Sequence, residues 1–224
     1  MRLPIIALIL LAIICPLAGG YVAEGSVSPL VEGVVTTEGR GVPGVEINVW
    51  DGHTNRKAVS DGEGKFAIAG LAPGAQFALR FTPKDHRSVR ADGLRFPENG
   101  NLFLGLEYAA TQRGQSYSFR VSSNPSTGYE WFLLQQGDTA VAAFRGNAME
   151  SEETPDQAEL QSPKKGEFSS VPVSVGSSAG RGGWERWTFQ AFGEGQSVIV
   201  LGYCRPWETE VSPARYHLFS LLVR

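Results

Sequence analysis

Residues 117–129 have the sequence YSFRVSSNPSTGY. In the first part of this stretch, apolar residues are separated by single polar residues, which is typical of a β-strand with one buried face. In the second part, Pro125 fixes its own φ angle and Gly128 permits a positive one. The stretch therefore predicts a strand followed by a stiff loop, with Ser126 and Thr127 at the tip of that loop.

The same alternation continues through the rest of the C-terminal half. The apolar positions predicted to share one face are Tyr117, Phe119, Val121, Trp131, Leu133, Trp187, Phe189, Ala191, Ile199, Leu201, Tyr203 and the run 217–223. We interpret this face as the interior of an antiparallel sandwich. The polar, acidic stretch between Asn147 and Lys165 is predicted to be a solvated loop.

The N-terminal half shows shorter alternating runs that are interrupted by Gly, Pro, Asn and Asp. Strands are predicted at residues 31–36, 45–50, 65–69 and 76–81. The pattern begins anew around residues 107–114, and no segment has a sustained helical period. The sequence therefore predicts an all-β fold of two tandem β-sandwiches.

Composition narrows the range of functions. Of the 224 residues, 42% are hydrophobic and 19% are charged, which is enough apolar material for compact cores. The net charge is −3 and no run of basic residues occurs, so we expect no nucleic-acid partner.

Catalysis is not expected, and neither is a cofactor or a bound metal. The three histidines, His53, His86 and His217, match no metal-ligand spacing. If the N-terminal segment is removed, Cys204 is the single remaining cysteine, and a structural thiol is a simpler interpretation than a nucleophile that lacks an evident base.

Residues 1–20 have the features of a signal peptide. Arg2 precedes an apolar run at residues 3–17, which is short for a membrane span, and small residues precede Tyr21. We expect export to a secreted or periplasmic location. Two alternatives remain open, an uncleaved signal anchor and a lipoprotein signal that uses Cys15, and either would attach the protein to a membrane.

Two further loops of the C-terminal half have unusual compositions. Gly180-Arg181-Gly182-Gly183 lacks bulk and would let backbone groups approach a partner closely, although a flexible hairpin end would look the same. Arg205-Pro206-Trp207 follows a predicted strand and presents two residue types that are enriched in binding hot spots. A buried Trp207 is the alternative for this loop.

The N-terminal half resembles the carboxypeptidase regulatory-like domains, which are transthyretin-like sandwiches, over residues 28–107. The segments that carry this resemblance are Gly33-Val34-Val35, Gly44-Val45, Ser60-Asp61, Gly64-Lys65-Phe66 and Leu71-Ala72-Pro73-Gly74. Asp61 and Glu63 lie in a glycine-rich turn, where turn formation explains them more simply than metal ligation. The resemblance implies a spacer or docking role for this half.

The C-terminal half, residues 110–224, resembles the chagasin family of cysteine peptidase inhibitors. The family pattern is an NPTTG-aromatic loop, a GxGG loop and an RPW or RPF loop, and all three occur here in that order. Ser126 replaces the usual threonine, which keeps the hydroxyl group and removes a methyl group.

The chagasin resemblance implies an immunoglobulin-like sandwich whose three loops form a wedge that enters the active-site cleft of a papain-like peptidase. The implied binding residues are Asn124, Pro125, Ser126, Thr127, Gly128, Tyr129, Gly180, Arg181, Gly182, Gly183, Arg205, Pro206 and Trp207. We expect a monomeric, reversible, competitive inhibitor of a papain or cathepsin L type enzyme, with residues 110–224 sufficient for inhibition. The alternative is a secreted or cell-surface binding module for carbohydrate or protein that does not inhibit peptidases.

Overall fold

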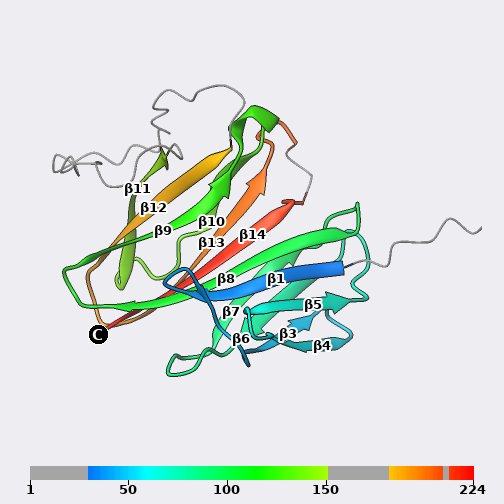
Figure 1. The fold of residues 1–224 in the computed structure, drawn as a ribbon, viewed down its shortest axis with the longest axis horizontal. Coiled ribbons are helices and arrows are strands. Elements are labelled where there is room, and N and C mark those ends of the chain that lie inside the picture. Colours follow the sequence, from blue (N-terminus) through cyan, green and yellow to red (C-terminus); the bar gives the residue numbers. More distant parts are fainter. Residues whose placement is uncertain (1–29, 151–181, 209–211) are drawn as a thin grey trace, which may run out of the picture.

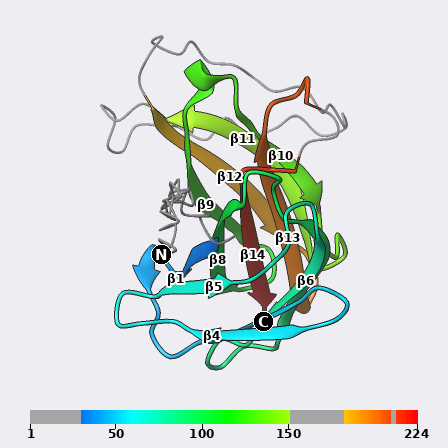
Figure 2. The same cartoon turned by 90° about the vertical axis from the view of Figure 1, so that its right-hand side faces the viewer.

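The computed structural model describes residues 30–150, 182–208 and 212–224, and these residues form strands, turns and one short 3-10 helix (Figure 1). The strands make three stacked sheets, so two β-sandwiches share the sheet in the middle (Figures 1 and 2). The all-β prediction and the prediction of two sandwiches are both confirmed. No helix among the described residues is long and apolar enough to span a membrane.

The middle sheet contains strands from both halves of the chain. Its members, in spatial order, are β10 (Glu130–Gln135), β13 (Gly195–Cys204), β14 (Arg215–Val223), β8 (Asn101–Thr111), β1 (Leu30–Thr37) and β2 (Arg40–Gly41), and β5 (Lys65–Ala69) also pairs with β1. Strand β8 runs parallel to β1 on one side and parallel to β14 on the other. It joins the two halves through continuous backbone pairing.

The first outer sheet belongs entirely to the N-terminal half. It consists of β4 (Asn55–Val59), β3 (Glu46–Trp50), β6 (Gln76–Phe81) and β7 (Val89–Arg95), in that order. Its inner face packs on the middle sheet through fully buried side chains such as Ile47, Leu79 and Phe81. Its outer face remains open in the described part of the molecule.

The second outer sheet belongs to the C-terminal half. It consists of β11 (Ala142–Glu150), β12 (Gly183–Ala191) and β9 (Ser116–Ser123). Phe119, Trp187 and Phe189 from this sheet pack against Phe219 and Leu221 of the middle sheet.

The eleven single positions that the sequence placed on an inward face belong to the second core or pack against it, so that prediction is confirmed for them. The run 217–223 was predicted to share that face but divides between the two faces of its strand: Phe219, Leu221 and Val223 belong to the second core, and Leu218 belongs to the first.

Side-chain alternation lets the middle sheet serve both cores, because successive residues of a strand point to opposite faces. On β8, Leu104 and Leu106 belong to the core of the first sandwich, whereas Ala109 belongs to that of the second. On β14, Leu218 and Phe219 divide in the same way. The expected boundary at residues 107–110 therefore falls inside a strand that both sandwiches use.

The strands predicted for the N-terminal half are confirmed within one or two residues. The solvated loop predicted from Asn147 to Lys165 is wrong at its start, because β11 continues through Glu150. Glu150 is half-buried and forms ion pairs with Arg120 (2.9 Å) and Arg186. The two arginines compensate the charge of Glu150, which explains how an acidic residue can be the last residue of a strand. The rest of the predicted loop lies outside the described residues.

The turn at residues 61–64 agrees with the interpretation that Asp61 helps to form the turn. The Asp61 carboxylate accepts hydrogen bonds from the backbone N–H groups of Glu63 and Lys65, each at 2.9 Å. Such a bond from an aspartate to the backbone two residues later defines an Asx turn. Asp61 is thus occupied in shaping the hairpin.

Candidate functional site

The loop between β9 and β10 is a compact turn with its own internal hydrogen bonds. Pro125–Thr127 form a single 3-10 turn, η1, and Gly128 closes it with a φ of 77°, in the left-handed region that favours glycine. The N–H groups of Thr127 and Gly128 donate to the carbonyl oxygens of Asn124 and Pro125, at 3.1 and 2.9 Å. The sequence signals that predicted a stiff loop here therefore act as expected.

The two hydroxyl groups at the tip of this loop are oriented by Asn124. Ser126 Oγ donates to Asn124 Oδ1 and Thr127 Oγ1 donates to the Asn124 carbonyl oxygen, both at 2.6 Å. Both side chains are exposed. Since each hydroxyl proton is used internally, the oxygen lone pairs remain available as acceptors for a partner.

The Arg205-Pro206-Trp207 loop packs directly against the first loop. A Cβ atom at Gly128 would lie 2.5 Å from Cη2 of Trp207, so the indole ring occupies the space that the missing side chain leaves. The guanidinium of Arg205 lies 4.6 Å from the centre of the Tyr129 ring and pairs with Glu208 at 3.0 Å. Trp207 is nevertheless 66% exposed, so the alternative of a buried Trp207 is wrong.

Tyr203 connects the two loops from below. Its hydroxyl accepts a hydrogen bond from the N–H of Asn124 at 2.9 Å. Its ring stacks on Tyr129 at 5.3 Å and packs against Trp131 at 4.9 Å. The sequence assigned Tyr203 to the core, and it identified no role in holding the loops. The position of Tyr203, immediately before Cys204 and Arg205, was the only available signal.

The glycine-rich loop adjoins the first loop on the side of β9. Gly183 is paired with Ser123, the residue before Asn124, and Gly182 is exposed. Gly180 and Arg181 lie outside the described residues. Trp184 follows the glycines and is 45% exposed, so it adds an aromatic surface at this end that was not predicted from the sequence.

Strand pairing brings the described parts of the three loops to one end of the second sandwich (Figures 1 and 2). Ser123 is opposite Gly183, and Glu130 is opposite Cys204. The first loop lies between Ser123 and Glu130, the glycine-rich loop ends at Gly183, and the Arg205-Pro206-Trp207 loop follows Cys204. Eleven of the thirteen predicted site residues are described, and all eleven lie at this end.

Burial shifts the pKa of two ionisable groups near this end. Burial raises the pKa of the Cys204 thiol, and the nearby carboxylates of Glu208 and Glu130 raise it further, so the unreactive thiol form is favoured. Burial also raises the pKa of Glu185, which accepts a 2.5 Å hydrogen bond from Asn147. No cluster of His, Cys, Asp and Glu within the described ranges could hold a metal ion.

A protein-family model matches the segment of the chain that contains this loop end. Residues 110–220 match the family model of the chagasin family peptidase inhibitors, I42. The matched segment spans the three loops and the second outer sheet. This match supports peptidase inhibition in general. The members of the chagasin family are inhibitors and not enzymes. The transthyretin-like interpretation of the N-terminal half stays a prediction.

Comparisons with individual proteins give distant similarities. No curated protein matches the sequence. A cysteine protease inhibitor of Entamoeba histolytica, EhICP2, aligns with 53% of this chain and 86% of its own, with 19% identity and a TM-score of 0.36. Domains 4 and 5 of the surface-layer protein SbsC align with 80% of this chain and 70% of their own, with 10% identity and a TM-score of 0.23.

Proposed function

We propose that the protein is a reversible, competitive inhibitor of papain-like cysteine peptidases, and that the chagasin-like loop end fills the active-site cleft of the enzyme. The observation that carries the proposal is the direct packing of Trp207 on Gly128, with Arg205 on Tyr129, which fixes two loops against each other before any partner binds. A preformed epitope loses little conformational entropy on binding.

Each loop has a distinct part in this mechanism. The exposed Ser126 and Thr127 would lie nearest the catalytic groups of the peptidase, where their oxygens can accept hydrogen bonds. Trp207 supplies the exposed aromatic surface that anchors one side. Gly182 and Gly183 would contact the other side through backbone groups.

Inhibition then needs no chemistry in this chain. The tip of the first loop is a closed 3-10 turn, so it offers no extended peptide bond in line for attack by the catalytic thiolate. The bound inhibitor should remain uncleaved and dissociate intact. An interface of standard size, about 1,600 Å² in total, is compatible with nanomolar affinity when its central anchors pack well.

We also propose that the protein acts outside the cytoplasm. The motivation is the signal-like segment at residues 1–20. Cell fractionation with N-terminal sequencing of the recovered protein would test this, and recovery from the cytoplasm with residues 1–20 intact would contradict it.

The deciding experiment is a titration of active-site-quantified papain, and of a cathepsin L type enzyme, with purified residues 21–224. We expect a stoichiometric loss of hydrolysis of a fluorogenic peptide, together with an intact inhibitor by mass spectrometry. Full peptidase activity at micromolar inhibitor, or cleavage between residues 124 and 129, would overturn the proposal.

A further inference from the structure

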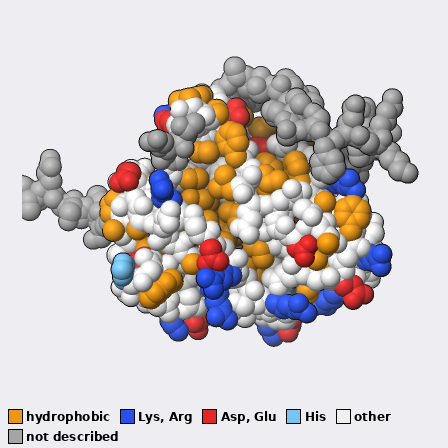
Figure 3. All heavy atoms as spheres, turned by 180° about the vertical axis from the view of Figure 1, so that it is seen from behind, with side chains coloured by type: hydrophobic (Ala, Val, Ile, Leu, Met, Phe, Trp, Pro, Cys, Tyr) orange, Lys and Arg blue, Asp and Glu red, His pale blue; other side chains and the backbone are white. Residues whose placement is uncertain are grey.

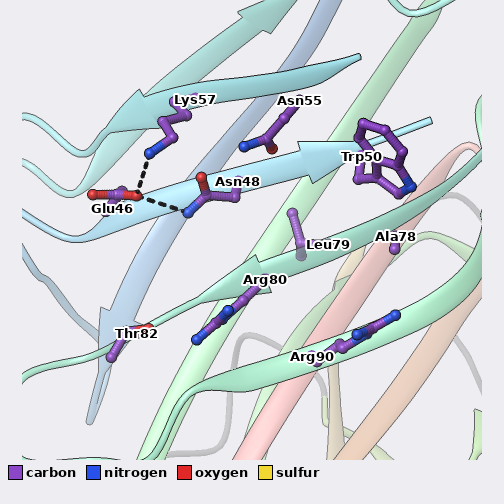
Figure 4. Close-up of a pocket in the computed structure, with 10 residues that line it drawn as sticks. All are labelled: Glu46, Asn48, Trp50, Asn55, Lys57, Ala78, Leu79, Arg80, Thr82 and Arg90. Carbon is purple, nitrogen blue, oxygen red and sulfur yellow. Dashed lines mark hydrogen bonds and ion pairs between the residues drawn. The ribbon is translucent and has the colours of Figure 1, made fainter. Parts of the chain in front are cut away.

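The outer face of the first outer sheet carries a row of basic and amide side chains. Asn48 on β3 is paired with Lys57 on β4 and with Arg80 on β6, and Arg80 is paired with Arg90 on β7. The four residues therefore form one line across the sheet (Figure 4). Three steps between strands give this line a length of about 14 Å. Figure 3 shows lysine and arginine side chains along its lower edge, where these strands lie in Figure 1.

The charges along this row are unequally compensated. Lys57 pairs with Glu46 at 3.2 Å and Arg90 pairs with Asp92 at 2.8 Å. Arg80 donates to the hydroxyl of Ser88 at 2.7 Å and forms no ion pair among the described residues.

Arg80 is also directly opposite Arg90. Like charges in directly opposite positions destabilise a sheet. An anion bound between the two guanidinium groups would relieve this repulsion.

An exposed aromatic ring lies in the neighbouring row. Trp50 is 45% exposed and is paired with Asn55 on one side and Ala78 on the other. The small Ala78 lies between the indole and the arginines. The outer face carries a hollow of about 530 Å³ that includes this gap and is lined by residues of all four strands. Figure 4 shows Trp50 at one end of this hollow, with Arg90 and Arg80 beyond Ala78.

We propose that this face binds an acidic saccharide, one that carries a carboxylate or a sulfate. The C–H face of a sugar ring would pack on the Trp50 indole, while the acid group would lie between Arg80 and Arg90. The amides of Asn48 and Asn55 and the carboxylate of Glu46 supply donors and acceptors for hydroxyl groups. A single exposed aromatic ring beside a row of basic and amide side chains fits a saccharide better than a nucleic acid, which would need several stacking platforms.

This site is independent of the loop end. It belongs to the N-terminal half, and its sheet lies on the opposite side of the middle sheet from β9, β11 and β12 (Figure 1). Both sites could be occupied together, so an acidic polysaccharide would retain the inhibitor at a surface. The proposal does not depend on peptidase inhibition.

Isothermal titration calorimetry of residues 21–224 with tetragalacturonate, a heparin tetrasaccharide and the neutral cellotetraose tests this assignment. We expect at least one acidic saccharide to bind and the neutral one to bind at least tenfold more weakly. Arg80→Glu and Trp50→Ala should each weaken binding at least tenfold. Arg113→Glu, which reverses an exposed charge on the β8–β9 turn, should leave binding unchanged.

Four outcomes would overturn the proposal: no binding of either acidic saccharide, equal binding of cellotetraose, equal weakening by Arg113→Glu, and binding of a poly-glutamate peptide in place of the saccharides. Thermal melts will show whether the variants are folded. Papain titrations of the same variants separate the two proposals, because inhibition should persist in Arg80→Glu whether or not saccharides bind.

Discussion

The loop end of the second sandwich and the outer face of the first outer sheet are both exposed, but they are organised differently. At the loop end, side chains hold one another in place: Trp207 covers Gly128, Arg205 lies over Tyr129, and Tyr203 binds the backbone of Asn124. On the sheet face, the register between strands places the side chains. Their ion pairs, such as Lys57 with Glu46 and Arg90 with Asp92, join side chains on the same strand or on adjacent strands. The loop end should therefore be sensitive to single substitutions in its packing, and the sheet face to changes of charge.

The two regions nevertheless depend on one scaffold. Strand β8 pairs with both β1 and β14, and the middle sheet contributes to both cores. A cut between the halves should therefore damage the loop end even though no loop residue is removed.

The largest expected effect comes from isolating residues 110–224. This fragment lacks nearly all of β8, so β14 becomes an edge strand and the apolar face around Tyr216 and Leu218 is exposed. In contrast to the expectation from sequence, we expect no cooperative thermal transition by circular dichroism and little inhibition of papain. Residues 30–224 serve as the control. A fragment that melts within a few degrees of this control and inhibits equally would show that the halves are independent.

The next largest effect should follow Trp207→Ala. Loss of an exposed aromatic anchor is expected to cost about 2 kcal/mol of binding, equivalent to a roughly 30-fold higher inhibition constant. The inhibition constant for papain measures this, with Trp207→Phe as a variant that retains a ring. An unchanged constant in a folded Trp207→Ala protein would remove Trp207 from the interface.

A matched pair of glycine substitutions measures the packing between loops. Gly128 and Gly114 have similar φ angles, 77° and 85°, but a Cβ atom meets Trp207 only at Gly128 and meets nothing within 4 Å at Gly114. Both alanine variants should lose about 1 kcal/mol of stability because of the left-handed backbone. Only Gly128→Ala should also weaken papain inhibition, by roughly tenfold, since the indole must move. Equal inhibition by the two variants would contradict the contact.

The smallest effect concerns Glu185 and depends on pH. Because burial raises the pKa of Glu185 in the folded protein, its protonated form is favoured there, and the stability that it contributes at acidic pH is lost as the pH rises through the raised pKa. Glu185→Gln should therefore raise the melting temperature by about 2–4 °C at pH 7 and by less at pH 4. Glu194→Gln, at an exposed position, is the control. A gain that is the same at both pH values would contradict this assignment.

Much of the fold was predictable because its signals are local. Alternating apolar residues predicted the inward faces of the second sandwich, and glycine and proline punctuation predicted four strands of the first half. Strands β4, β7, β8 and β11 were not predicted. The residues of β4 and β11 are mostly half-exposed, whereas β8 is buried along most of its length, so none of these three strands shows a clear alternation of apolar and polar residues. For β4 and β11, partners on neighbouring strands replace hydrophobic burial, and alternation along the chain does not reveal partners. For β8, burial on both faces removes the alternation itself.

The sequence by itself determined the chemistry of the loops. Pro125, Gly128 and Pro206 have intrinsic backbone preferences that do not depend on their neighbours. The exposure of Trp207 was decided only by the tertiary structure. The tertiary structure alone decided the sharing of the middle sheet, the role of Tyr203 beneath two loops, and the row of Lys57, Arg80 and Arg90. These features arise from register between strands that are distant in sequence, and register is fixed only when buried faces pack together.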